Sequence, residues 1–231
     1  MFKQSSLRFA AASLVATFAM SSVASATDTE TDPPRQYEVK VTNITRGAQF
    51  TPILTAVHND RVSLFTLGAP ASSGLKTLAE EGNTAPLSDT LSTNPNVLSV
   101  ATQGGLLGPG QTRVFTVESS AKFDSLTVAA MLIPTNDAFF SVTVEDLPRG
   151  RDTVSRRGVA YDSGTEQNDE LCSSIPGPFF TECNGPGGGG KPGNGEGFVH
   201  VNGGIHGVGD LKASLRDWRN PVVSVTVRRV R

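Results

Sequence analysis

Alternation of apolar and polar residues dominates much of the chain. Residues 37–43 place Tyr37, Val39 and Val41 on one side, and residues 223–230 repeat the pattern with valines. A period of two predicts a strand with one buried face. Similar short segments recur, and we expect strands at residues 37–43, 50–58, 97–102, 112–118, 126–133, 138–144, 198–201 and 223–230.

Residues 126–133 differ from the other strands because they are almost continuously apolar. A strand that is covered on both faces has this pattern, so we expect it to be central in its sheet. The link at residues 119–124 is short and polar. It predicts a hairpin between strands 112–118 and 126–133.

One segment, residues 73–81, has helical spacing. Three apolar residues fall on one face of this helix: Leu75, Leu78 and Ala79. A serine can cap its start and Gly82 can end it. Glu80 and Glu81 are expected to be solvated charges at the helix end. Residues 83–96 are rich in proline, threonine and asparagine and predict a loop.

The order of these elements predicts the fold class. About eight short strands at regular spacing, with one short helix, indicate an all-β antiparallel β-sandwich. Long glycine-rich loops accompany the strands, most clearly at residues 104–110 and 185–193. About 200 residues suffice for a single hydrophobic core, so we expect residues 37–231 to form one domain.

The first residues predict export. Lys3 and Arg8 precede or flank a short apolar run at residues 9–20, and Ala24-Ser25-Ala26 has the small-x-small form of a cleavage site. We therefore expect a signal peptide at residues 1–26, cleaved after Ala26, then a polar leader at residues 27–36. The run is shorter than the roughly 20 residues of a membrane span. The prediction is a secreted or periplasmic protein with no membrane span.

Export changes how the two cysteines, Cys172 and Cys183, are interpreted. In an oxidising compartment they predict one disulfide that closes a short loop. A two-cysteine metal site would need histidines at ligand spacing, and a catalytic thiol would need a base; the sequence supplies neither. The formal net charge of −2 and the absence of a basic stripe argue against a nucleic-acid partner.

Candidate metal chemistry concentrates in residues 161–170, which hold four carboxylates and no lysine or arginine. Gly164 allows a sharp turn, so Asp162 and Glu166 can point their oxygens at one place. Calcium prefers such an oxygen cage. The spacing is not that of an EF-hand, and an acidic surface turn is the alternative interpretation.

Asp137 lies at the end of the central strand, where loops carry function. The loops that hold Asp137 and Asp162 can meet at one end of an antiparallel sandwich. Clustered carboxylates repel one another, and a divalent cation would remove that cost.

The chain has three histidines: His58, His200 and His206. They could act as bases of a secreted hydrolase or as metal ligands, or they could serve as turn and packing residues. No G-x-S-x-G or H-E-x-x-H motif occurs. A non-enzymatic protein is therefore the main prediction, with a hydrolase or a purely structural envelope protein as alternatives.

Several motifs, in order, resemble the spondin N-terminal domain family, including its bacterial single-domain secreted members. They are Thr51-Pro52-Ile53-Leu54, the segment 75–82, Ile133-Pro134-Thr135-Asn136-Asp137, Tyr161-Asp162-Ser163-Gly164-Thr165-Glu166, Gly204-Ile205-His206-Gly207 and Asn220-Pro221-Val222-Val223. The resemblance covers roughly residues 37–230.

The resemblance implies a C2-like β-sandwich that binds calcium and acts in cell-surface or matrix adhesion. It implies one structural Ca²⁺ held by Asp137, Asp162 and Glu166, where Glu166 replaces an aspartate of the family motif. It also implies a binding role for Glu118, which matches a family glutamate linked to receptor binding. The expected partner is an extracellular or cell-surface protein or glycan.

Overall fold

The structure, a computed structural model, describes residues 33–177, 180–183, 188 and 193–231. The predicted signal peptide, residues 27–32 of the predicted leader and part of the glycine-rich run lie outside the described residues. Within the described part, no helix is both long and apolar enough to cross a membrane.

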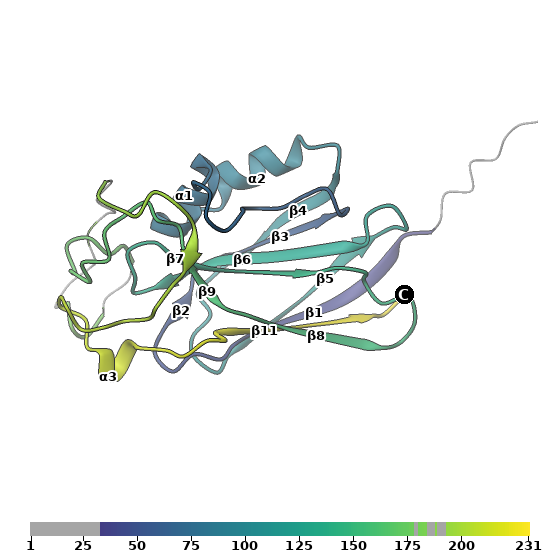
Figure 1. Cartoon of the computed structure of the whole chain (residues 1–231). Coiled ribbons are helices and arrows are strands. Elements are labelled where there is room, and N and C mark those ends of the chain that lie inside the picture. The colour runs from purple at the N-terminus through teal and green to yellow at the C-terminus, as the bar shows by residue number, and fades with distance from the viewer. Residues whose placement is uncertain (1–32, 178–179, 184–187, 189–192) are drawn as a thin grey trace, which may run out of the picture. The chain divides into compact units, whose positions relative to one another are not determined.

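Two antiparallel sheets form the fold (Figure 1). One has the order β5 (Thr112–Ser119), β1 (Arg35–Asn43), β11 (Val223–Arg229), β8 (Thr153–Gly158). The other has the order β10 (His200–Val201), β9 (Ala160–Asp162), β7 (Ala138–Val144), β6 (Ser125–Ile133), β3 (Ile53–His58), β4 (Val97–Gln103), and β2 (Gln49–Phe50) pairs with β6. The predicted all-β sandwich is confirmed.

The main core lies between the two sheets. Alternate valines of β1 and β11 point inward and meet the apolar face of β6. Two helices cover the other face of the larger sheet: α1 (Ser73–Glu81) packs on β6, and α2 (Ala85–Ser92) packs on α1 and β4. Leu75, Leu78 and Phe139 belong to this second cluster. Every residue of β6 is buried, which explains its continuous apolar run and confirms its central place.

Helix α1 has the predicted bounds and caps. The Ser72 hydroxyl accepts a hydrogen bond from the Leu75 backbone N–H, and Gly82 adopts a φ of 66°. The prediction that Glu80 is solvated is wrong, because Glu80 is only 5% exposed. Helix α2 occupies the segment that was expected to be a loop. Its few apolar residues stabilise it by packing on α1 and β4, which no local pattern shows.

The predicted hairpin between strands 112–118 and 126–133 is also wrong. Strand β5 pairs with β1, whereas β6 pairs with β3 and β7 in the other sheet. The link between β5 and β6 therefore crosses from one sheet to the other, and the Ser119 hydroxyl donates to the Phe123 carbonyl within it. Three further elements were not predicted: the charged edge strand β8, the short strand β9 and the short helix α3 (Ala213–Arg216).

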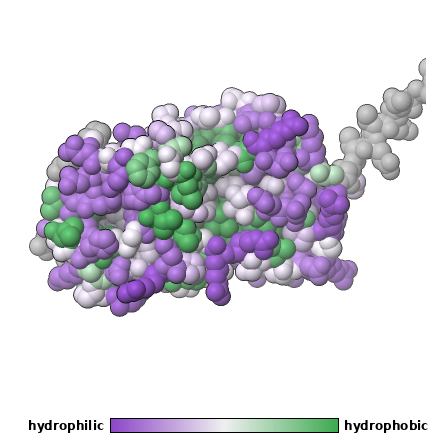
Figure 2. Space-filling model, in the orientation of Figure 1, coloured by the Kyte–Doolittle hydropathy of each residue, from purple (hydrophilic) through white to green (hydrophobic). Residues whose placement is uncertain are grey.

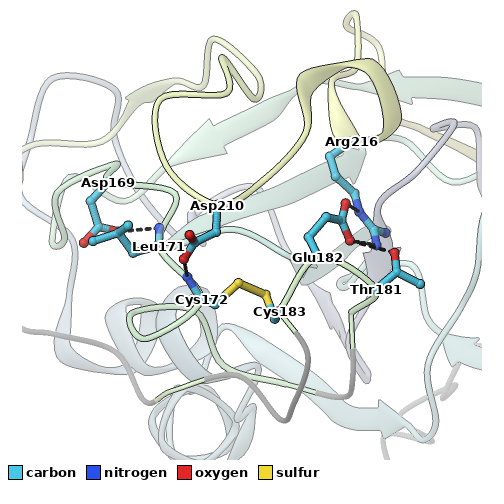
Figure 3. Close-up of a disulfide and its surroundings, with 8 residues drawn as sticks. All are labelled: Asp169, Leu171, Cys172, Thr181, Glu182, Cys183, Asp210 and Arg216. Carbon is cyan, nitrogen blue, oxygen red and sulfur yellow. Dashed lines mark hydrogen bonds and ion pairs between the residues drawn. A yellow bond between two sulfur atoms is a disulfide. The ribbon is translucent and has the colours of Figure 1, made fainter.

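The predicted Cys172–Cys183 disulfide is present, with its Cα atoms 5.4 Å apart (Figure 3). Next to it, Glu182 accepts two hydrogen bonds from the Arg216 guanidinium, each 2.8 Å long. Arg216 also donates to the Gly47 carbonyl. This bidentate pair lowers the pKa of Glu182 to about 2. Through these hydrogen bonds Arg216 connects the disulfide loop to α3 and to the turn before β2.

We expect Arg216→Met to lower the free energy of unfolding by about 3 kcal/mol at neutral pH, because it leaves the Glu182 carboxylate buried without its partner. The matched control is Arg228→Met, which removes an exposed pair with Glu38 and should cost less than about 1 kcal/mol. Urea denaturation of the three proteins measures both effects.

The Arg216–Glu182 pair also predicts a pH dependence. The depressed pKa of Glu182 contributes stability above about pH 4.5, and this contribution is lost as the pH falls toward 2. The difference in the free energy of unfolding between the wild type and Arg216→Met should therefore become smaller below about pH 4.5. If this difference stays constant down to about pH 2, the Arg216–Glu182 pair does not cause the loss of stability in Arg216→Met.

Candidate metal site

Three neighbouring strands bring the candidate ligands to one edge of the larger sheet. Ala138, the first residue of β7, pairs with Asp162, the last residue of β9. On its other side Asp162 pairs with His200 of β10. Residues that are directly opposite in a sheet share a face, so this register sets Asp162 beside His200 and next to the turn that holds Asp137.

Asp137 is fully buried and organises the acidic segment. Its Oδ2 accepts hydrogen bonds from the backbone N–H groups of Thr165 (2.8 Å) and Glu166 (3.1 Å) and from the hydroxyls of Ser163 (2.8 Å) and Thr165 (3.2 Å). Its Oδ1 is buried and has no hydrogen-bond partner among the described residues. A buried carboxylate oxygen without a partner is costly unless a cation compensates it.

Asp162 is also fully buried, and both of its oxygens accept hydrogen bonds. Oδ1 accepts from the Gly164 backbone at 2.8 Å, while Oδ2 accepts from the amides of Asn168 (2.8 Å) and Asn202 (3.0 Å). Burial, and next the charge of Asp137, raise the pKa of Asp162 to about 6. The turn requires glycine, since Gly164 has a φ of 69°.

Glu166 is 1% exposed, and neither of its carboxylate oxygens has a hydrogen-bond partner among the described residues. Burial, and then the charges of Glu80 and Asp137, raise its pKa to about 8. Glu80 comes from α1, where its Oε1 lies 3.5 Å from Lys76 Nζ. Helix α1 thus adds a buried carboxylate that the sequence did not reveal, because Glu80 lies off the apolar stripe of the helix.

The residues present fit a hard cation. Asp137 and Glu166 hold three buried carboxylate oxygens without hydrogen-bond partners, and Asp162 lies beside Asp137. Ca²⁺ takes six to eight oxygen ligands at about 2.4 Å, and carboxylates supply such ligands. Asp137, Asp162 and Glu166 are the residues that would hold it.

A different set of side chains already stands at ligand distance. Among the described residues, the ligand atoms of Asp162, Glu196 and His200 lie within 4.8 Å of one another. The three predicted ligands do not form such a group. Because ligand atoms on one Ca²⁺ are at most about 4.8 Å apart, one predicted side chain must move if all three bind one ion. His200 was predicted only as a possible ligand or base, and Glu196 was not predicted at all.

The structure does not bring the other predicted residues to this site. Glu118 is exposed on β5, near the start of β6, whereas Asp137 follows the end of β6. His58 is buried, with Nδ1 2.6 Å from the Asn59 carbonyl and Nε2 2.7 Å from the Thr127 hydroxyl. His58 therefore has the surroundings of a packing residue.

Glu170 holds the loop that contains His206. Its carboxylate accepts hydrogen bonds from the backbone N–H groups of His206, Gly207 and Val208. Asn136 in turn accepts one from the backbone N–H of Glu170. Glu170 thus positions loops rather than offering free oxygens, a role that its place in the acidic segment did not distinguish.

Residues 22–173 match the Spondin_N family, the spondin N-terminal domain. The chain belongs to the spondin N-terminal domain family. Among curated proteins no sequence matches it. The family match includes Asp137, Asp162 and Glu166 of this spondin-family chain, whereas Glu196 and His200 lie beyond it.

The raised pKa values predict how the stability of the metal-free protein depends on pH. Folded Asp162 and Glu166 keep their protons up to about pH 6 and about pH 8, whereas unfolded carboxyls lose theirs near pH 4. The folded state therefore binds more protons, and its free energy of unfolding should fall as the pH rises from about 4 to 8. Urea denaturation in chelator measures this fall.

Glu166→Gln should flatten this decrease between about pH 6 and pH 8, because it removes the group with the higher pKa. Glu81→Gln, an exposed neighbour of Glu80 on α1, should leave the decrease unchanged. If the wild type is equally stable at pH 6 and pH 8 in chelator, Glu166 is not held in a protonation-sensitive site.

Proposed function

We propose that this spondin-family domain is an exported, non-enzymatic calcium-binding module. The observation that carries the proposal is the set of buried carboxylate oxygens of Asp137 and Glu166 that have no hydrogen-bond partner in the described part of the chain. A Ca²⁺ ion supplies the missing positive charge. Held by Asp137, Asp162 and Glu166, it is structural: it fastens the acidic segment to the turn between β6 and β7.

The surface near the site supports an adhesive or other interaction role. Exposed apolar residues lie close to it along the chain: Phe198 and Val201 are within two residues of His200, and the backbone of Val208 is bound by Glu170. Elsewhere the visible face is largely hydrophilic, with apolar patches near its middle (Figure 2). An extracellular or cell-surface protein or glycan is the proposed partner. Calcium then controls this surface by holding the loops that carry it.

Calcium should stabilise the mature protein, residues 27–231, because the ion binds the folded state. At a calcium concentration 100 times the Kd, the gain is about 2.7 kcal/mol, which corresponds to an upward Tm shift of roughly 5–10 °C. Thermal melting in chelator and then in added calcium measures the shift. Equal melting temperatures in the two conditions would contradict the proposal.

Asp162→Asn should abolish most of the calcium-dependent Tm shift, because the neutral amide lacks the negative charge that attracts the ion. The matched control is Asp89→Asn, which changes an exposed carboxylate on α2 and should retain the full shift. A normal shift in Asp162→Asn would remove Asp162 from the ligand set.

A further inference from the structure

A cluster of two carboxylates and one imidazole lies at the edge of the larger sheet. His200 Nε2 lies 3.6 Å from Asp162 Oδ1 and 3.4 Å from Glu196 Oε2. Strand β10 places His200 beside Asp162, and Glu196 reaches the same point from the loop before β10. We propose that Asp162, Glu196 and His200 form a site for a zinc-class transition metal, which shares only Asp162 with the proposed calcium site.

The orientation of the His200 ring supports this assignment. Nδ1 lies 3.1 Å from the Val201 carbonyl, which can accept its N–H. The lone pair of the neutral ring then belongs to Nε2, the atom that faces the two carboxylates. Metal-binding histidines are commonly oriented in this way by a carbonyl behind the ring. Nε2 itself is shielded from solvent and has no hydrogen-bond partner among the described residues.

A lone pair and two carboxylates that face one another need a positive charge between them, either a proton or a metal ion. Charged N–H···O hydrogen bonds measure about 2.7–2.9 Å. The separations of 3.4 and 3.6 Å are longer than that. Ligand atoms around a tetrahedral metal, with bonds of about 2.0–2.1 Å, lie roughly 3.3–3.4 Å apart. The 3.4 Å separation of Nε2 from Glu196 matches this spacing, and the 3.6 Å separation of Nε2 from Asp162 is close to it.

Asp162, the carboxylate that faces His200 Nε2, is fully buried. Asp162 is also held rigidly, because the amides of Asn168 and Asn202 bind its other oxygen. Such partners around a ligand carboxylate orient it for a metal.

The choice of metal follows from the ligand types. Calcium prefers oxygen ligands throughout, whereas imidazole nitrogen suits zinc and its neighbours among the transition metals. Two carboxylates balance the charge of a divalent ion. The side chains of His200 and Glu196 are 30% and 40% exposed, so water can complete the coordination from the solvent side.

This site does not depend on the calcium proposal. It shares Asp162 with the predicted calcium ligands, but Glu196 and His200 lie outside the residues that match the family. The two proposals therefore fail or succeed separately.

The test uses the untagged mature protein and Co²⁺, whose visible absorption is intense in a tetrahedral site. We expect one equivalent of Co²⁺ to bind, and Zn²⁺ to displace it. His200→Gln and Glu196→Gln should each weaken Co²⁺ binding at least tenfold. Both residues are partly exposed, so these variants should fold, which circular dichroism checks.

His206→Gln is the matched control and should bind Co²⁺ like the wild type. The proposal is overturned if the wild type gives no tetrahedral Co²⁺ spectrum, or if His200→Gln binds Co²⁺ normally. It is also overturned if Glu166→Gln loses Co²⁺ binding, since the two sites would then be one. If Co²⁺ binds through His200 but calcium gives no Tm shift, this proposal stands and the calcium proposal fails.

Discussion

Asp137 accepts four hydrogen bonds through one carboxylate oxygen, and the acidic segment folds around that oxygen. The donors all lie within residues 163–166, so this one charge determines the path of the chain after β9. The same fold buries the other oxygen of Asp137 without a partner and brings Asp162 alongside. The interaction that shapes the loop therefore also leaves a buried carboxylate oxygen without a partner among the described residues.

Asp162 stands between two kinds of ligand. On one side are the carboxylates of the family motif, which offer oxygen alone. On the other is the imidazole of His200, with Glu196 beside it. A hard cation and a transition metal would each find suitable ligands at this end of the sheet, and through the shared carboxylate the binding of one ion would affect the binding of the other.

The last part of the chain reaches this site because several contacts hold its loops. The disulfide and the Glu182–Arg216 pair fasten the loop after the acidic segment to α3. The Glu170 carboxylate accepts hydrogen bonds from the backbone at residues 206–208. These contacts hold segments that come before and after β10 in the sequence. Strand β10 pairs His200 with Asp162.

Local patterns in the sequence determined the strands of the sandwich, the helix α1 and the acidic segment. Alternation and capping depend on neighbouring residues, so they can be read along the chain. The strands β8 and β9 and the helix α2 were missed because packing and strand pairing stabilise them against weak local signals. Likewise, the sheet to which β5 belongs depends on its pairing with β1, far away in sequence.

The same distinction applies to the site. The motif around Asp162 and the position of Asp137 were sufficient to nominate three carboxylates from the sequence. Glu80, Glu196 and His200 could not be placed, because the packing of α1 and the pairing of β9 with β10 bring them there. The sequence by itself determined which residue types occur and where the chain turns. Strand register and loop contacts decided the distances between side chains, because they join residues that are far apart along the chain.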